Sequence, residues 1–220
     1  MKIIGHIETN FNTKFGLPRQ SGIVEEITGK IVFEKEYAVK EAFRGLEEFS
    51  HIWLLWQFSE AVREDWSPTV RPPLLGGNKR MGVFATRSPF RPNSIGLSAV
   101  RLLRIEYEKE GPVLYVAGAD LKNGTPIYDI KPYLAYADSH PDAIGGFTEN
   151  LEERKVSVEF PQELLGKIPK EKQKELIGAL SCDPRPSYID DENRVFGFSF
   201  SDYEIKFRVK ENILTVISVE

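Results

Sequence analysis

Apolar residues in the first part of this chain fall mainly in runs of β-strand length. The runs lie at residues 2–9, 29–33, 51–58, 95–107, 113–120 and 127–133. Only residues 37–49 show helical spacing, and Gly45 is a weak point within them. Many long strands with a single helix among them favour a closed or strongly coiled antiparallel β-barrel over a βαβ fold. We therefore predict a mainly β domain over residues 1–140.

The pattern changes after a charged, glycine-containing stretch at residues 140–154. A strand is predicted at 155–160 and a helix at about 169–180, with Pro169 suited to the first helical turn. Three further strands are predicted near 195–200, 203–209 and 213–219. Residues 141–220 thus read as a small α+β C-terminal domain.

A stiff, cationic connection links two apolar, strand-like runs at 83–86 and 95–100. Pro89 and Pro92 fix the backbone there and cannot extend a central strand. The connection and the residues before it carry four cations: Lys79, Arg80, Arg87 and Arg91. Guanidinium groups in a preorganised frame suit an anionic or carboxylate-bearing ligand. In the alternative interpretation the arginines pair with local acidic residues and only pin the loop.

Composition narrows the class of protein. The 220 residues are 41% hydrophobic and 28% charged, as in ordinary globular proteins, and the net charge of −4 argues against a generally basic nucleic-acid-binding surface. Cys182 is the only cysteine and the three histidines are dispersed, so we expect no disulfide and no metal site. The chain has neither a signal peptide nor a membrane-length apolar run, which predicts a reducing, cytoplasmic location without membrane contact.

Chemistry-bearing residues gather at strand ends. No glycine-rich nucleotide-binding motif and no nucleophile elbow occur. Polar loops lie instead at 17–22, 57–59 and 120–126, beside the arginine connection. Asp120 ends a strand, where its carboxylate caps a turn or accepts hydrogen bonds from a ligand amine or ribose hydroxyl. The Asn-Gly pair at 123–124 is typical of a simple hairpin, which is the alternative interpretation.

Taken together, these motifs resemble one family over nearly the whole chain. The matching segments are residues 18–20, 49–53, 71–73, 76–78, 81–88, 90–93, 95–98, 120–121, 124–126, 129–133 and 183–188. They are similar to the TsaA/TrmO (YaeB-like) family. The resemblance implies a β-barrel methyltransferase that uses S-adenosylmethionine (SAM), acts as a homodimer and methylates N6 of threonylcarbamoyladenosine (t6A) at position 37 of tRNA, giving m6t6A. One departure is Lys-Asn at 122–123, where a more acidic turn is expected, so a carboxylate role at 123 is in doubt.

The resemblance also implies a set of cofactor-binding residues. These are Arg19, Gln20, Ser21, Gly22, Phe58, Ser59, Arg87, Leu97, Gly118, Ala119 and Asp120. By our inference Arg87 clamps the methionine carboxylate, Leu97 and Phe58 sandwich the adenine, and Asp120 holds a polar group of SAM. The alternative for Leu97 and Phe58 is simple core packing.

RNA contacts are expected from basic residues, because lysine and arginine neutralise phosphates. The candidates are Lys79, Arg80, Arg91 and, from the C-terminal domain, Arg185. A solvated charged face is the alternative for each. Phe90 or Tyr188 is a candidate for stacking on an unpaired base. We interpret Trp53 and Trp56, on an apolar strand, as core residues.

Three residues are candidates for the proton transfer that N6 methylation needs. Asp129 and Tyr133 are the candidate bases, and Lys131 is the candidate for stabilising charge on the carbamoyl or threonyl group. A purely structural strand over 129–133 is the alternative. At the level of the whole protein, methylation of a small metabolite with SAM and a non-catalytic RNA- or anion-binding barrel are the competing functions.

Overall fold

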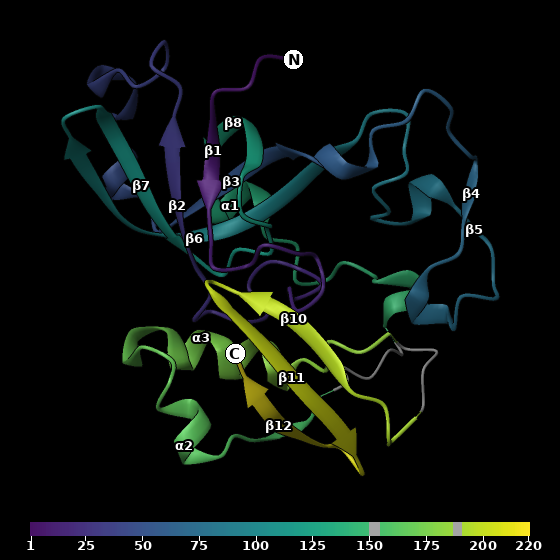
Figure 1. Ribbon diagram of the computed structural model, residues 1–220. Coiled ribbons are helices and arrows are strands. Elements are labelled where there is room, and N and C mark those ends of the chain that lie inside the picture. Colours follow the sequence, from purple (N-terminus) through teal and green to yellow (C-terminus); the bar gives the residue numbers. More distant parts are fainter. Residues whose placement is uncertain (150–154, 187–190) are drawn as a thin grey trace.

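The computed structural model describes residues 1–149, 155–186 and 191–220, and it shows a barrel stacked on a smaller sheet-and-helix domain (Figure 1). Six strands close the barrel through antiparallel pairs only. Their order around it is β1 (Gly5–Glu8), β2 (Thr28–Phe33), β7 (Gly111–Ala117), β6 (Ile95–Glu108), β3 (His51–Gln57) and β8 (Thr125–Pro132). The predicted mainly β fold with a closed antiparallel barrel is confirmed.

Alternation along the strands decides which side chains fill the barrel. On β3, Ile52, Leu54 and Trp56 are buried, and the residues between them face outward. The β3–β6 register places Trp56 opposite Gly96. A Cβ on Gly96 would lie 2.2 Å from the Trp56 ring, so only glycine leaves room for the indole at this end of the barrel.

The C-terminal domain is a four-stranded sheet with two helices. Its strand order is β10 (Phe196–Phe200), β11 (Tyr203–Lys210), β12 (Ile213–Val219) and β9 (Ser157–Glu159), with α2 (Gln162–Leu165) and α3 (Lys170–Ser181). Helix α3 starts directly after Pro169, one residue later than predicted. The expected boundary near residue 140 falls in the segment between β8 and β9, which also holds the short helix α1 (Ala135–Asp138) and the 3₁₀ turn η6 (Gly146–Thr148).

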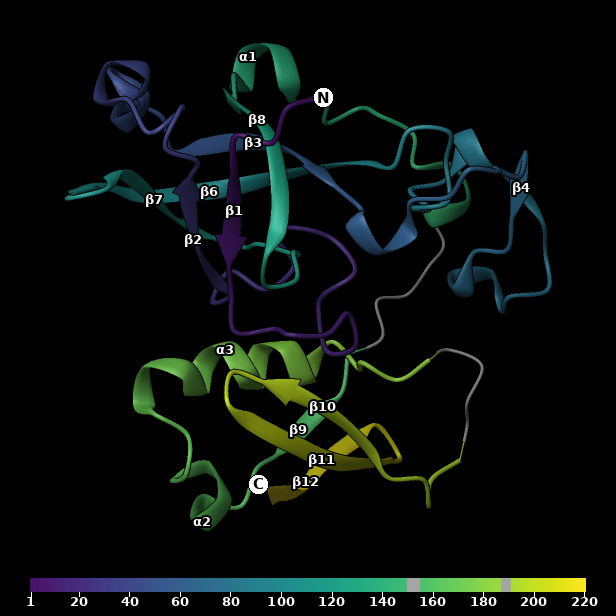
Figure 2. The same cartoon turned by 45° about the horizontal axis from the view of Figure 1, so that its top comes forward.

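The segment that joins β1 to β2 runs between the two domains (Figure 2). Phe11, Val24 and Ile27 from this segment are buried in the hydrophobic core of the C-terminal domain. The backbone also bridges, because Ser201 N–H donates to the Asn10 carbonyl at 2.5 Å. Both ends of the segment are therefore held by the second domain.

A projecting lobe is formed by residues 59–94, between β3 and β6 (Figure 1, right). It consists of short pieces: η3 (Ser59–Ala61), β4 (Thr69–Val70), η4 (Pro73–Leu75), β5 (Met81–Gly82) and η5 (Val83–Ala85). β4 and β5 pair antiparallel, with Thr69 opposite Gly82. The last part of the lobe is the arginine connection, which follows η5 and leads into β6.

Two predicted elements are wrong. The helix expected over residues 37–49 is replaced by two 3₁₀ turns, η1 (Lys40–Phe43) and η2 (Leu46–Glu48), because Gly45 between them adopts a left-handed φ of 85°. The strand expected at 83–86 is the turn η5, in which Thr86 N–H donates back to the Val83 carbonyl at 3.2 Å. In both places a buried side chain, Phe43 or Val83, satisfies the apolar pattern without a longer element.

Candidate functional site

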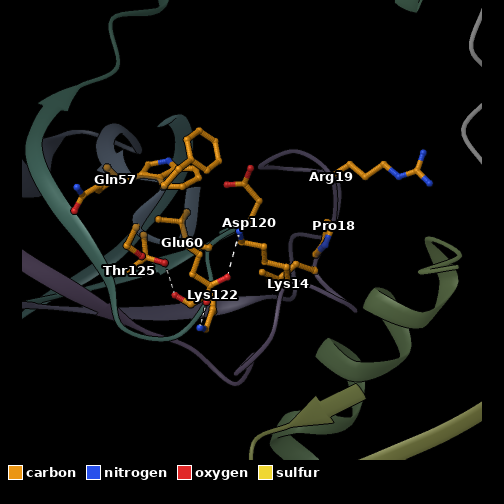
Figure 3. A pocket seen from close by; sticks show the side chains of 13 residues that line it. Lys14, Pro18, Arg19, Gln57, Glu60, Asp120, Lys122 and Thr125 are labelled. Carbon is orange, nitrogen blue, oxygen red and sulfur yellow. Dashed lines mark hydrogen bonds and ion pairs between the residues drawn. The ribbon is translucent and has the colours of Figure 1, made fainter. Parts of the chain in front are cut away.

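A cavity of about 250 Å³ opens where β3 ends, beside the loops at 14–19 and 120–125 (Figure 3). Its wall combines apolar side chains with both signs of charge. The lining residues are Lys14, Leu17, Pro18, Arg19, Trp56, Gln57, Phe58, Ser59, Glu60, Asp120, Leu121, Lys122 and Thr125. Four predicted cofactor residues are among them: Arg19, Phe58, Ser59 and Asp120.

Asp120 is the most distinctive polar group of the cavity. Its Oδ1 accepts a hydrogen bond of 2.6 Å from Ser98 Oγ, and Ser98 in turn accepts one of 3.0 Å from Trp56 Nε1. Burial raises the pKa of Asp120, although the Ser98 hydrogen bond and the positive charge of Arg87 act in the opposite direction. No ion pair found among the described residues includes Asp120. A shielded carboxylate with spare acceptor capacity suits a ligand that carries amine or hydroxyl donors.

The aromatic side of the cavity comes from the end of β3. The Trp56 and Phe58 rings lie 4.2 Å apart between centroids, at an interplanar angle of 60°. Phe58 N–H donates to the Ser94 carbonyl at 2.9 Å, which fixes the chain where it leaves the barrel. Trp56 therefore does more than fill the core as predicted, because its buried ring also forms part of the cavity wall.

A small ion-pair cluster closes the other side. Glu60 accepts a hydrogen bond from Lys122 through Oε1, and its Oε2 lies 3.2 Å from Lys14 Nζ. The two lysines lower the pKa of Glu60, with the Lys122 hydrogen bond contributing most. Lys122, one of the two residues that depart from the family pattern, therefore neutralises Glu60 in the cavity wall.

Backbone contacts bring the 19–22 loop onto the strand end at 118–120. Gly22 N–H donates to the Gly118 carbonyl at 2.9 Å. Gly118 has a φ of 75°, and a Cβ there would lie 3.3 Å from the Gly22 backbone, so glycine permits this close approach. A backbone hydrogen bond from Ser21 also lowers the pKa of Asp120. Four further residues that the resemblance implied for cofactor binding therefore lie beside Asp120: Ser21, Gly22, Gly118 and Ala119.

Arg87 reaches the same loop from the projecting lobe, where its guanidinium donates to Gln20 Oε1. Arg19 is among the lining residues, but its side chain extends away from Asp120 (Figure 3). Arg87, by contrast, is close enough to Asp120 for its charge to lower the pKa of that carboxyl.

Leu97 is not brought into this cavity. It is 56% exposed and lies on the outer face of β6, opposite Leu55 of β3. Its neighbour Ser98 points inward and holds Asp120. Leu97 is therefore packed neither in the core nor in the cavity wall.

The three residues predicted for proton transfer also lie on the outer face. Asp129 is opposite Leu55, and its carboxylate is 3.3 Å from Lys131 Nζ. The Tyr133 ring packs near Trp53, at 5.5 Å between centroids. None of the three is among the described residues that line the cavity. Leu97, Leu55 and Asp129 do share one row across β6, β3 and β8.

The residues predicted for RNA contact differ in their exposure and in the hydrogen bonds that they make within the protein. Lys79 and Arg80 are exposed, and Arg80 donates to Thr69 Oγ1 at 2.6 Å. Arg91 donates to the Thr86 carbonyl at 2.8 Å. Arg185 is only 10% exposed and makes hydrogen bonds of 2.8 and 2.9 Å to the carboxylate of Asp183. Tyr188 lies outside the described residues.

Sequence reasoning missed Ser98, Lys14 and Glu60. Ser98 occupies an inward position on β6, and the alternation of that strand was the available signal. No described group of three or more His, Cys, Asp or Glu side chains has the arrangement of a metal site. Among the helices that the structure describes, none combines the length and apolarity that membrane crossing requires.

Comparisons with known proteins agree with this architecture. Residues 6–139 match the tRNA-methyltransferase O N-terminal domain, and residues 153–220 match the TrmO C-terminal domain. The tRNA (adenine(37)-N6)-methyltransferase of Escherichia coli is 40% identical over 99% of this chain and 96% of its own length. A Pseudomonas aeruginosa relative, RcsF, whose name assigns it provisionally to the S-adenosylmethionine-dependent methyltransferases, is 36% identical over 98% of this chain and 95% of its own. A crystal structure of TrmO from Pseudomonas aeruginosa superposes with a TM-score of 0.78 at 30% identity, covering 99% of this chain and 97% of that one. The chain therefore belongs to the tRNA-methyltransferase O family.

Proposed function

We propose that this protein transfers a methyl group from SAM to N6 of the adenine at position 37 of tRNA, and that the adenosine acted on is t6A, giving m6t6A. The observation that carries the proposal is that Arg19, Phe58, Ser59 and Asp120 all line one cavity. Family membership over both domains supports the reaction class. A tRNA substrate also favours a cytoplasmic location.

The donor groups of the cavity suit SAM. The Asp120 carboxylate is an acceptor for an amine or for ribose hydroxyls, and Trp56 and Phe58 offer apolar surface to the adenine. A cavity of about 250 Å³ is smaller than the roughly 300–1,000 Å³ of typical ligand pockets. We infer that it holds part of the ligand and that the remainder lies over the Gln20–Arg87 pair, where Arg87 meets the methionine carboxylate.

SAM supplies an already activated methyl group, so the protein has mainly to align the acceptor and exclude water. Alignment of two reactants is worth roughly 7–11 kcal/mol of the barrier. N6 exchanges its hydrogen for methyl, so one proton leaves, and a positioned base contributes about 10²–10⁴-fold. We keep Asp129 as the proposed base, Tyr133 as the second candidate and Lys131 as the group that balances charge. Because these residues lie on the outer face, the N6 that they serve has to be held at the cavity of a second subunit packed against that face.

The proposed base has a direct test. Asp129→Asn should abolish methyl transfer while leaving SAM affinity, measured by calorimetry, within a few-fold of wild type. Asp142→Asn, an exposed aspartate outside the barrel, is the matched control and should keep full activity. Equal loss of SAM affinity and turnover in Asp129→Asn would reject the role of a base.

The outer face of β6 and β3 is our proposed dimer surface. Leu97, Leu55 and Trp53 give this face an apolar centre, which a second copy would cover. Leu97→Asp should then convert a dimer to a monomer in sedimentation experiments. A Leu97→Asp protein that sediments as the wild type does would contradict this assignment.

The decisive assay uses methyl-labelled SAM and tRNA that carries t6A, followed by mass spectrometry of the nucleosides. We expect m6t6A with the protein, and none without it. Label in a small molecule would instead support a metabolite methyltransferase. SAM binding without transfer to any substrate would support a non-catalytic binding barrel.

A further inference from the structure

The projecting lobe carries an exposed aromatic pair that no step of the proposed reaction uses. The Phe84 side chain is 73% exposed and Trp66 is 50% exposed. Their ring centroids lie 6.0 Å apart with an interplanar angle of 31°. Side chains this exposed add little to the hydrophobic core, so core packing does not account for the pair.

The strand pairing of the lobe holds the two rings together. Thr69 of β4 lies opposite Gly82 of β5, and Val83 N–H donates to the Pro68 carbonyl at 2.9 Å. This ladder places Trp66 and Phe84 at the same end of the two strands. Val83, only 1% exposed, anchors the turn η5 that presents Phe84. The pair is therefore preorganised, and a ligand that binds it pays little to order it.

The charge of the lobe indicates what the pair binds. Residues 66–94 contain no aspartate or glutamate, although the whole chain has a net charge of −4. The same residues contain five cations: Arg71, Lys79, Arg80, Arg87 and Arg91. The Arg91 guanidinium lies 6.0 Å from the centre of the Phe84 ring. Glu64 and Asp65 lie immediately before this stretch. Aromatic rings set among cations are typical of surfaces that bind single-stranded nucleic acid.

We propose that Trp66 and Phe84 form a stacking platform for an unpaired base of the tRNA, beside the adenine that is methylated. The proposal rests on the proposed function and adds a recognition site to it. The lobe begins at the cavity, with Ser59 and Glu60 in its wall, and returns near it through Arg87, whose charge lowers the pKa of Asp120. RNA that occupies the cavity region can thus reach the lobe. Phe84 and Trp66 replace Phe90 as the stacking group, because the Phe90 ring already lies 4.2 Å from the Arg63 guanidinium.

The test compares ring removal with ring retention. We would measure binding of a fluorescent anticodon stem-loop RNA with adenine at position 37, using wild type, Phe84→Ala, Phe84→Leu and Phe84→Tyr. Loss of one stacked base weakens binding by about 5- to 150-fold, so we expect that loss for the alanine and leucine variants and near wild-type binding for tyrosine. Because Phe84 is so exposed, these variants should keep the circular dichroism spectrum and SAM affinity of the wild type.

A matched control is Tyr107→Ala. Tyr107 is also exposed, at 49%, and has a cation near its ring, with Lys40 Nζ at 4.9 Å, but it lies in the β6–β7 hairpin across the barrel from the lobe (Figure 1). The Tyr107→Ala variant should bind the RNA as wild type does. A fully paired, blunt-ended RNA duplex should bind wild type and Phe84→Ala equally, since it offers no unpaired base.

Several outcomes would overturn the platform. Unchanged stem-loop binding in Phe84→Ala would do so, and so would a loss that tyrosine does not restore. A change in sedimentation without a change in RNA binding would assign the pair to contact with a second copy. The proposed function fails separately: wild type that binds the stem-loop through Phe84 but methylates no tRNA would retain the platform and remove the reaction.

Discussion

Glu175 gives the sharpest prediction because it is a carboxyl group buried between the two domains. It lies on α3 and is 3% exposed. Its Oε2 accepts a hydrogen bond of 3.0 Å from Asn10 Nδ2, whereas Oε1 is buried without a partner among the described residues. Burial raises the pKa of Glu175 from 4.5 to about 7, despite the Asn10 hydrogen bond and the charge of Lys172. Replacing Glu175 by glutamine keeps the shape and removes the charge.

The size of the effect follows from this pKa. Each tenfold change in proton affinity is worth about 1.4 kcal/mol, so a rise from 4.5 to about 7 corresponds to about 3 kcal/mol. The folded state keeps the Glu175 proton up to about pH 7, while the unfolded state loses it near pH 4.5. This contribution to the free energy of unfolding is therefore complete below pH 4.5 and is lost as the pH rises through about 7. Glutamine does not ionise, so the free energy of unfolding of the variant does not fall over this pH range.

Urea unfolding of wild type and Glu175→Gln at several pH values measures the difference. At pH 8 the variant should be more stable by about 3 kcal/mol, and the two proteins should converge below pH 4.5. Glu171→Gln, at an exposed position of the same helix, should show no gain at pH 8. A Glu175→Gln difference that stays constant with pH, or a variant less stable than wild type at pH 8, would refute the reasoning.

Three further predictions concern the site and the RNA surface. Ser98→Ala removes the 2.6 Å hydrogen bond that lowers the pKa of Asp120, so calorimetry should show SAM affinity reduced by about tenfold at neutral pH and more as the pH falls. Arg185→Gln leaves the buried carboxylate of Asp183 uncompensated and should cost about 3–5 kcal/mol in urea unfolding; an unchanged stability would return Arg185 to the phosphate-contact role. Lys79→Gln should weaken tRNA binding and reduce the slope of log affinity against log salt by about 1, with SAM affinity unchanged.

The local pattern of apolar and polar residues was sufficient to predict the strands but not the turns. The run at 95–107 predicted β6 within one residue, because apolar residues recur along it, no proline interrupts it, and its one glycine, Gly96, lies next to its start. The helical spacing at 37–49 failed, since Gly45 can adopt a left-handed φ that ends one turn and starts another. Spacing reports which side chains are buried, whereas backbone reversal at a single glycine depends on what the segment packs against.

The candidate site was predictable in its loops and not in its interior. Arg19 and Asp120 stand in recognisable motifs at strand ends, and the structure brings both to one cavity. Ser98 could not be assigned, because its contact with Asp120 depends on how β6 and β7 are paired in the barrel, and strand register is not a local property. Alternation along β6 turns Leu97 to the opposite face from Ser98.

The second domain is tied to the candidate cofactor cavity through the segment between β1 and β2. Phe11 and Val24 are buried in the C-terminal core on either side of the loop that carries Arg19 and Gln20. Leu17, within that loop, packs against the same core and also lines the cavity. A loop fixed at both ends and at its centre has fewer conformations to lose when a ligand binds. The barrel strands supply Asp120 and the aromatic wall, and the C-terminal domain holds the loop against them. A substitution such as Gly178→Leu in α3, where even a Cβ would lie 2.6 Å from Val24, should therefore weaken SAM binding without touching the cavity.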